Sequence, residues 1–451
     1  MLPVDSLPYG GSTALVKITQ SAALLAFSMA TALPLQGQAR AVTLTEAIRL
    51  AQRVQPTVVQ ARGALAVAGS DVRSAYSAFL PSLSGNAGAG QSFFPQAQSR
   101  LDPQTGQLIT GTNSNKSVNF GVNSSLILFD GFRREATIRS SKADRDASAA
   151  SLTNQEAQVA LTTSLEFFSA LSSQQLVRAR EAGIQRADEQ FTIAVAKLRT
   201  GAATVSDSLR AVVTVNEARL QKLEAERQLA TAEANLARLI GEPGRVSAVD
   251  DPSLYDTDLE LDPDALLDEG VERSPRVLAS DASVRAARAG VTAAKSGYWP
   301  ILSLSANTQL SGSQLDDYDL QRTSNINLGL NWNLFDRFNR ERQVDQSAVV
   351  LDNATATLAD DRRQVAASLT SQIAALNTAR VRIDVTALSL EAAQADLRVQ
   401  VERYRLGSIT MVEVLTSQES LTRAEEASVS ARIDFLRAKA QIEAIIGRPL
   451  S

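Results

Sequence analysis

The chain has 451 residues, of which 44% are hydrophobic, enough to bury a sizeable core, and its formal net charge is −4 with both signs interspersed. It contains no histidine and no cysteine, so zinc sites, imidazole bases, Ser-His-Asp triads, thiolate nucleophiles and disulfides are excluded. The sequence also lacks a phosphate-binding glycine loop and a broad basic face. We therefore expect no enzyme, no catalytic residues, no cofactor, no metal site and no nucleic-acid partner.

The N-terminus has the layout of a secretory signal peptide. Lys17 precedes an apolar run from Ala22 to Leu33, and Ala39-Arg40-Ala41 offers small residues before a cleavage point. A buried N-terminal helix or an anchor is the alternative, but this run is too short to span ~30 Å of hydrocarbon as a helix. We predict that residues 1–41 are a signal peptide and that the mature chain starts near Val42.

The rest of the chain contains two similar halves. The stretch from Val54-Gln55-Pro56 to Pro81 matches the stretch from Arg273-Ser274-Pro275 to Pro300, 219 positions later. A second set of matches lies 206 positions apart: Leu128-Phe129-Asp130 with Leu334-Phe335-Asp336, Gly201 with Gly407, and Ile240-Gly241-Glu242-Pro243 with Ile446-Gly447-Arg448-Pro449. Such self-similarity indicates one structural unit written twice. We predict a first structural repeat over residues 42–243, a linker over 244–262 and a second repeat over 263–451.

Each repeat predicts a helix, a strand pair and a long helical hairpin. The strand pairs are placed at 82–129 and 301–335, and the hairpins at 131–240 and 337–446. Prolines are absent from 132–200 and 337–406, so each stretch can form one helix of roughly 100 Å at 1.5 Å per residue. Gly201 and Gly407 mark the hairpin turns, and a glycine followed by proline ends each hairpin.

The returning helices carry a seam of small and apolar residues in steps of three and four. In the first hairpin the seam reads Ala211, Val215, Ala218, Lys222, Ala225, Leu229, Ala232, Leu236 and Leu239. In the second it reads Val414, Ser417, Leu421, Ala424, Ser428, Ala431, Phe435, Ala438, Ile442 and Ile445. This spacing predicts coiled-coil packing at close approach.

The predicted strands alternate between apolar and polar residues. One face of the last strand carries Ile326, Leu328, Leu330, Trp332 and Leu334, and the other carries Asn325, Asn327, Gly329, Asn331 and Asn333. Such alternation over about 10 residues is typical of transmembrane barrel strands, and also of a half-exposed soluble sheet. Aromatic residues at the helix-proximal strand ends favour the barrel: Phe79, Phe129, Tyr298, Trp299 and Phe335. Residues 91–117 and 311–323 are then outward loops.

The duplicated order of helix, strand pair and long helical hairpin resembles the TolC family of outer-membrane factors. The resemblance covers nearly all of the chain, from about Thr43 to Leu450. The resemblance is carried by Pro81 and Pro300 before the strands, Leu128-Phe129-Asp130-Gly131 with Leu334-Phe335-Asp336-Arg337, and the turns Arg199-Thr200-Gly201 and Tyr404-Arg405-Leu406-Gly407. It implies a mainly α fold with a β-barrel portion, in which long antiparallel coiled-coil hairpins form a periplasmic α-barrel. Four strands per chain would contribute to a twelve-stranded trimeric outer-membrane β-barrel. A need for partner chains agrees with the open edges of four strands, which lipid cannot satisfy.

The resemblance also implies gate residues at the periplasmic mouth, near the hairpin turns. Asp207 and Tyr404 match the positions of an inter-hairpin hydrogen bond, and Glu413 matches an acidic ring position. Ile409 and Thr416 depart from the family pattern, which has an arginine and an acidic residue there. From the residues themselves, Asp207 can equally satisfy free amides at a helix start, Tyr404 can be an ordinary interface tyrosine, and Glu413 can complement a helix dipole.

The implied function is a passive, gated export duct in the outer membrane, serving a tripartite efflux pump or a type I secretion system. The implied partners are a homotrimer, outer-membrane lipid, a periplasmic adaptor (membrane fusion protein) touching the turns at Gly201 and Gly407, and an inner-membrane RND or ABC pump. A periplasmic coiled-coil adaptor or structural protein without a membrane barrel is the alternative. The coiled-coil seams suit both, whereas the strand alternation favours the duct.

Overall fold

The computed structural model describes residues 39–93, 98–101, 104–111, 114–255, 262–312 and 320–450. The predicted signal peptide, apart from its last three residues, lies outside this set. Each half of the chain contributes two shorter helices, two strands of one sheet and two long helices. The elements of the first half are α1 (Leu44–Val54), α2 (Pro56–Ser77), β2 (Ser82–Phe93), β5 (Ser114–Phe129), α3 (Arg133–Arg199) and α4 (Val205–Ile240). Those of the second half are α5 (Pro263–Arg273), α6 (Pro275–Lys295), β7 (Ile301–Gly312), β8 (Gln321–Asn331), α7 (Asn339–Arg405) and α8 (Met411–Ile446).

Short elements occupy the connections between these parts. Strand β1 (Arg40–Val42) pairs in parallel with β6 (Val246–Ala248), so the predicted linker contains a strand. Strands β3 (Gln98–Leu101) and β4 (Leu108–Gly111) form a hairpin of their own between β2 and β5. The 3₁₀ turns are η1 (Pro252–Tyr255) and η2 (Ser296–Tyr298). The predicted outer loop at 91–117 is therefore partly strand.

The long hairpins have matched lengths and matched turns. Helices α3 and α7 each have 67 residues, and α4 and α8 each have 36. Gly201 and Gly407 adopt positive φ angles of 73° and 78°, which residues with a side chain rarely tolerate. Their backbone N–H groups donate to the carbonyls of Leu198 and Tyr404, both at 3.0 Å. The predicted turns are confirmed.

The coiled-coil seams lie inside. Most predicted seam residues are buried and the remainder are half-buried, including Lys222, whose ammonium pairs with Glu181 and Glu226 at 3.2 Å. The main core forms where helices of both halves meet, and its largest fully buried side chains include Phe167, Leu171, Leu236, Leu369 and Phe435. The predicted seam packing is confirmed.

The four main strands form one antiparallel sheet in the order β2-β5-β7-β8. Its register places apolar residues of neighbouring strands opposite one another, as in Phe120 with Leu310, Leu126 with Leu304, and Leu304 with Leu328. The predicted separation of apolar and polar faces is confirmed. Strand β8 ends at Asn331, short of the predicted end at 335. Directly after it, the Trp332 indole donates to the Tyr298 carbonyl at 3.3 Å.

A tight corner joins β5 to α3. Gly131 and Phe132 both have positive φ, and the rings of Phe129 and Phe132 pack edge to face with centroids 5.7 Å apart. Asp130 accepts a bond from the Arg133 backbone N–H at 3.2 Å and pairs with the Arg134 guanidinium at 3.2 Å. The carboxylate thereby satisfies a free amide at the start of a long helix.

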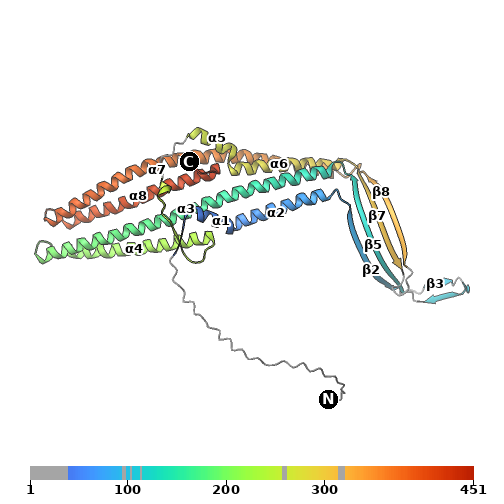
Figure 1. The fold of residues 1–451 in the computed structure, drawn as a ribbon, viewed down its shortest axis with the longest axis horizontal. Coiled ribbons are helices and arrows are strands. Elements are labelled where there is room, and N and C mark those ends of the chain that lie inside the picture. The colour runs from blue at the N-terminus through green and yellow to red at the C-terminus, as the bar shows by residue number, and fades with distance from the viewer. Residues whose placement is uncertain are drawn as a thin grey trace, which may run out of the picture. The chain divides into compact units, whose positions relative to one another are not determined.

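The corner before α7 repeats these contacts. Arg337 and Phe338 have positive φ, and the rings of Phe335 and Phe338 are 5.8 Å apart and also edge to face. Asp336 accepts a bond from the Arg340 backbone N–H and pairs with its guanidinium, both at 3.1 Å. In Figure 1 both corners join the sheet to the same end of the long helices, with the hairpin turns at the other end. None of the helices in the described ranges combines the length and the apolarity needed to cross a membrane.

Candidate functional site

The two hairpin tips meet in a small apolar cluster separate from the main core. It is formed by buried residues of all four long helices: Ala194, Ala211, Leu397, Tyr404, Met411, Val414 and Leu421. Ile409, which stands at one of the departures from the family pattern, packs against this cluster. The cluster holds the two turns together within one chain, so movement of one hairpin away from the other must expose it.

Tyr404 is the polar member of this cluster. Its side chain is almost fully buried, and no partner for its hydroxyl exists among the described residues. The Lys197 ammonium lies 4.3 Å from the ring centroid and donates to the Tyr404 carbonyl. Burial raises the pKa of the Tyr404 hydroxyl, and the nearby negative charge of Asp207 raises it further. The hydroxyl therefore stays protonated and is a free hydrogen-bond donor.

Asp207 is engaged with the start of its own helix. Its backbone N–H donates to Thr204 Oγ1 at 3.2 Å, and its carboxylate accepts from the Thr204 N–H at 3.1 Å and from Thr204 Oγ1 at 2.8 Å. This reciprocal capping box satisfies free backbone N–H groups at the start of α4. Within the described chain the carboxylate does not bond to Tyr404, although its charge acts on that residue.

Glu413 occupies the position in α8 that Asp207 occupies in α4. It is exposed, lies in the first turn of α8 and accepts a long bond of 3.5 Å from Thr410 Oγ1. Thr416 lies one turn further along and donates to its own helix, at the Val412 carbonyl, at 3.0 Å. The carboxylate of Glu413 is thus free to face solvent at the hairpin tip.

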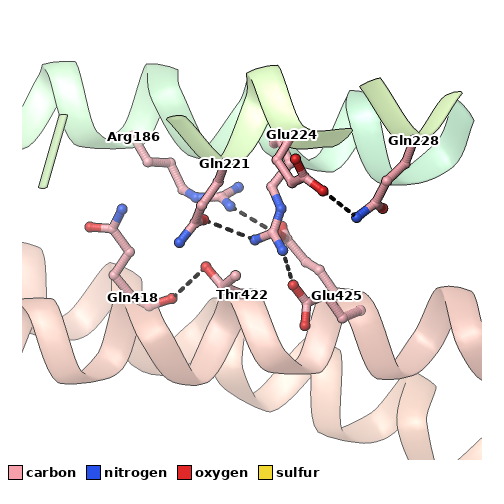
Figure 2. Close-up of polar contacts among 9 residues, drawn as sticks. Arg186, Gln221, Glu224, Gln228, Gln418, Thr422 and Glu425 are labelled. Atoms are coloured by element: carbon pink, nitrogen blue, oxygen red, sulfur yellow. Dashed lines mark hydrogen bonds and ion pairs between the residues drawn. The ribbon is translucent and has the colours of Figure 1, made fainter. Parts of the chain in front are cut away.

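A polar layer joins α3 to α8 at some distance from the tips. The Arg186 guanidinium pairs with Glu425 at 2.9 Å, with side-chain exposures of 23% and 16%. Arg180 pairs with Glu426 and also donates to Gln221 of α4 at 3.1 Å. Figure 2 shows Arg186 and Gln221 on one side of the gap between the two hairpins and Glu425 on the other. We call Arg180, Arg186, Glu425 and Glu426 the ion-pair layer.

The ion-pair layer was not predicted from the sequence. Glu425 and Glu426 directly follow the seam residue Ala424. Their sequence positions indicate that they lie beside the coiled-coil seam, but not which residues they contact. The two arginines lie on a helix whose other charged residues are mostly exposed. Which of the many charges on one helix meets which on another depends on the rotation and offset of the helices, and that information is not local.

Two cavities flank the contact between the hairpins. One of about 370 Å³ lies between α4 and α8 and is lined in part by Thr214, Ala218, Gln221, Gln418 and Thr422. The other, of about 380 Å³, lies between α3 and α7 and is lined in part by Gln190, Ile193, Leu397 and Val401. Packing between the hairpins is therefore incomplete between the ion-pair layer and the tips, which lowers the resistance to movement there.

The side chains of this site form contacts between the two helical hairpins. In the portions of the chain that the structure covers, no group of three or more acidic residues is placed to hold a metal ion. Its charged groups are ion-paired, capped or exposed, and the buried hydroxyl of Tyr404 lies in an apolar cluster. Such groups can hold two hairpins together and release them.

Comparisons with known proteins agree on one family. The sequence profile described as "Outer membrane efflux protein" matches residues 26–242 and 266–448. "Outer membrane efflux protein BepC" of Brucella suis biovar 1 is 24% identical over 421 residues, covering 92% of this chain and 87% of that protein. "Protein CyaE" of Bordetella pertussis is 25% identical over 407 residues, covering 86% and 80%. "Outer membrane protein TolC" of Escherichia coli K12 is 23% identical over 300 residues, covering 64% and 61%.

Solved structures share the fold. A structure of CusC superposes with a TM-score of 0.76 at 15% identity, covering 90% of this chain and 92% of that one. The outer membrane protein VceC of Vibrio cholerae gives a TM-score of 0.72 at 16% identity, covering 90% and 97%. The open state of the MtrE outer membrane channel of Neisseria gonorrhoeae gives 0.73 at 17% identity, covering 90% and 89%.

Proposed function

The chain belongs to the outer membrane efflux protein family, and on that premise we propose that it is the outer-membrane channel of a tripartite export machine, a passive duct with a gate. The observation that carries the proposal is the exposed apolar face of the sheet at the end of long helical hairpins. The outer membrane is its location, and the hairpins are its long periplasmic part.

The sheet requires a cover for both its apolar face and its edges. Ile326, Leu330 and Leu83 are 78%, 69% and 76% exposed, and strands β2 and β8 each have one unpaired edge. Exposed apolar surface and open strand edges are both unfavourable in water. Three copies that close a twelve-stranded barrel would pair every edge and turn the apolar face toward lipid.

The internal repeat supports the trimer and indicates how the copies meet. Helix α3 packs against α6 and α8, whereas its counterpart α7 makes no comparable contact with α2 or α4 in the same chain. Helices α4 and α7 both carry exposed apolar residues at helical spacing. On α4 these are Val205, Leu209, Val212, Leu220 and Leu223, and on α7 they are Val381, Val385, Leu388 and Val399. We infer that α4 of one copy packs on α7 of the next, as α8 packs on α3 within the chain.

The proposed function also assigns a role to each segment of the chain. Residues 1–41 act as the export signal, 42–243 and 263–451 as two repeats of one unit, and 244–262 as the link between them. Amino-terminal sequencing of the exported protein should find a start near Val42.

The gate belongs at the hairpin tips. The buried hydroxyl of Tyr404 lacks a partner, and Asp207 lies close enough for its charge to act on it. In the closed trimer we expect Asp207 to accept a bond from Tyr404, and Glu413 of the three copies to ring the mouth. The turns at Gly201 and Gly407 then face a periplasmic adaptor, which couples the duct to an inner-membrane RND or ABC pump.

Two of the relatives are described as parts of machines that export small molecules. TtgC of Pseudomonas putida is described as a toluene efflux pump outer membrane protein, and OpmQ of Pseudomonas aeruginosa as a pyoverdine export outer membrane protein. These descriptions support small-molecule export as the task of this chain. Type I secretion of a protein is the second task compatible with its fold.

The test is a conductance measurement on purified protein. Outer-membrane extracts should yield a trimer that dissociates only on heating, and this trimer should form channels in planar lipid bilayers. A protein that fractionates with soluble periplasm, with neither a heat-modifiable trimer nor conductance, would instead be an adaptor or structural rod.

A further inference from the structure

The polar face of the four-stranded sheet carries no charged side chain within the described strands. The register places hydroxyl, amide and glycine residues of all four strands side by side on this face: Ser84, Asn86, Gly88, Gly90, Ser117, Asn119, Gly121, Asn123, Ser125, Ser303, Ser305, Asn307, Gln309, Ser311, Gln321, Thr323, Asn325, Asn327, Gly329 and Asn331. Ile127 and Ile301 are its large apolar members and lie at the end next to the helices.

The two charged residues of these strands lie on the opposite, apolar face. Lys116 pairs with Gln91, next to Val118 and Ala89 on that face, and Arg322 pairs with Leu310. Both lie toward the loop end of the sheet, away from the helices. Charge is therefore kept off the whole described length of the polar face.

The neutral face is also closely fitted. The Asn123 side-chain amide donates to Asn86 Oδ1 at 3.0 Å. A Cβ atom on Gly121 would come within 2.6 Å of Asn86 Oδ1, and one on Gly88 within 2.8 Å of Asn119 Oδ1. Glycine at these two positions therefore lets asparagine side chains lie flat across the neighbouring strand.

We propose that this face makes the barrel section of the duct electrically neutral, so that polar substrates of either charge pass it without selection by sign. The proposal rests on the proposed function, which places this face toward the lumen. Selection between cations and anions in pores arises from rings of charged side chains, whereas hydroxyl and amide groups can donate hydrogen bonds to anions and offer oxygen atoms to cations. Any selection by charge then occurs at the hairpin end.

If this section is neutral, a charge introduced there should change the ion selectivity of the channel according to its sign. Asn327 is exposed on this face near the middle of β8, opposite Ser305, and each substitution would appear three times in a trimer. Asn327→Asp should shift the reversal potential in a salt gradient toward cation selectivity, and Asn327→Lys should shift it toward anion selectivity by a similar amount. Arg322→Gln is the matched control, because it removes a charge from the apolar face and should leave the reversal potential unchanged.

A second variant allows charge to be added after the protein has folded and formed channels. The chain has no cysteine, so Asn327→Cys can be modified after channels have formed, with a negatively or a positively charged methanethiosulfonate reagent. The thiolate attacks the reagent's sulfenyl sulfur, forms a mixed disulfide and releases a sulfinate. The two reagents should shift the reversal potential in opposite directions and by similar amounts.

The outcomes separate the inference from the function. Conducting channels in which neither charged substitution nor either reagent changes the reversal potential would overturn the lumenal placement of this face, with the function intact. Strongly unequal shifts for the two signs would overturn its neutrality. A parent protein that forms no channels would overturn the proposed function itself, and this inference with it.

Discussion

Arg186 of α3 and Glu425 of α8 form a mostly buried ion pair, 2.9 Å between nitrogen and oxygen, that ties one helical hairpin to the other. The positions that correspond to them in the other repeat, 206 residues away, are Ala392 and Arg219. The pair therefore has no equivalent where α4 of one copy is proposed to meet α7 of the next. Contact between the hairpins within the chain includes charged groups at this level, whereas the proposed contact between copies would rest on exposed apolar residues such as Leu220 and Leu388.

Breaking this pair should weaken the junction between the hairpins. Glu425→Ala leaves the Arg186 guanidinium half-buried without its partner, and we expect a loss of about 1–3 kcal/mol in the free energy of unfolding. Chemical denaturation measures it. Asp360→Ala is the control, because its pair with Arg363 is well exposed and should cost less than about 1 kcal/mol. Equal effects of the two substitutions would show that the ion-pair layer does not hold the hairpins together.

The Tyr404 hydroxyl gives a direct test of the gate. Tyr404→Phe removes a donor that has no partner within the described chain, so the stability of the single chain's fold should be nearly unchanged. Loss of the proposed bond to Asp207 in the closed trimer should raise the resting conductance in planar bilayers. Tyr255→Phe is the control, since the Tyr255 hydroxyl bonds to Asp250 and Gln175, both at 2.9 Å. That variant should lose stability without a change in conductance. If Tyr404→Phe conducts like the parent, the bond to Asp207 does not hold the mouth shut.

Glu413 should determine ion selectivity at the mouth. Three carboxylates around a narrow axis attract cations, so the parent channel should favour cations and be blocked from the periplasmic side by multivalent cations. Glu413→Ala should weaken both effects. A carboxylate that only complements the dipole of α8 contributes roughly 0.3–1 kcal/mol of stability and leaves the selectivity as it was. Bilayer recordings with and without multivalent cations distinguish the two roles.

The two corners of the sheet should respond in opposite ways to matched substitutions. Gly131 has a φ of 69°, and a Cβ there would lie 2.2 Å from the Trp299 Cβ, so Gly131→Ala should destabilise the fold or prevent assembly. Its counterpart Arg337 adopts a φ of 59° with a full side chain, so Arg337→Gly should relieve about 1–2 kcal/mol of backbone strain. Thermal unfolding of the trimer compares the two. Destabilisation by Arg337→Gly would mean that its side chain makes a contact between copies.

Stability should depend on pH through Glu443. Burial raises the pKa of this carboxyl above its ordinary value of 4.5, although it accepts a bond from the Leu450 N–H at 3.0 Å. A raised pKa in the folded state means that ionisation opposes folding, so this group favours the fold at low pH and disfavours it as pH rises through its folded pKa. Glu443→Gln keeps the acceptor without the charge. It should raise the melting temperature at pH 7 and have little effect below pH 4, and a gain of the same size at both pH values would exclude ionisation as the cause.

Local and periodic features of this protein were predictable from its sequence. The turns at Gly201 and Gly407 follow from a backbone conformation that glycine tolerates best, and the long helices follow from an absence of proline. The two faces of the sheet follow from alternation, because successive side chains of a strand point in opposite directions. Each signal is contained in a few neighbouring residues or in one period.

Choices among competing partners were decided only by the tertiary structure. Asp207 could cap its own helix or bond to Tyr404, and within the described chain the capping box with Thr204 is formed because its donors are three residues away. Arg186 could have met any of several acidic residues, and the offset between α3 and α8 brings it to Glu425. Predicted linker residues Val246–Ala248 became a strand because Arg40–Val42 lie alongside them. In each case, several possible contacts of similar strength compete. The three-dimensional arrangement of the segments therefore determines which contact forms.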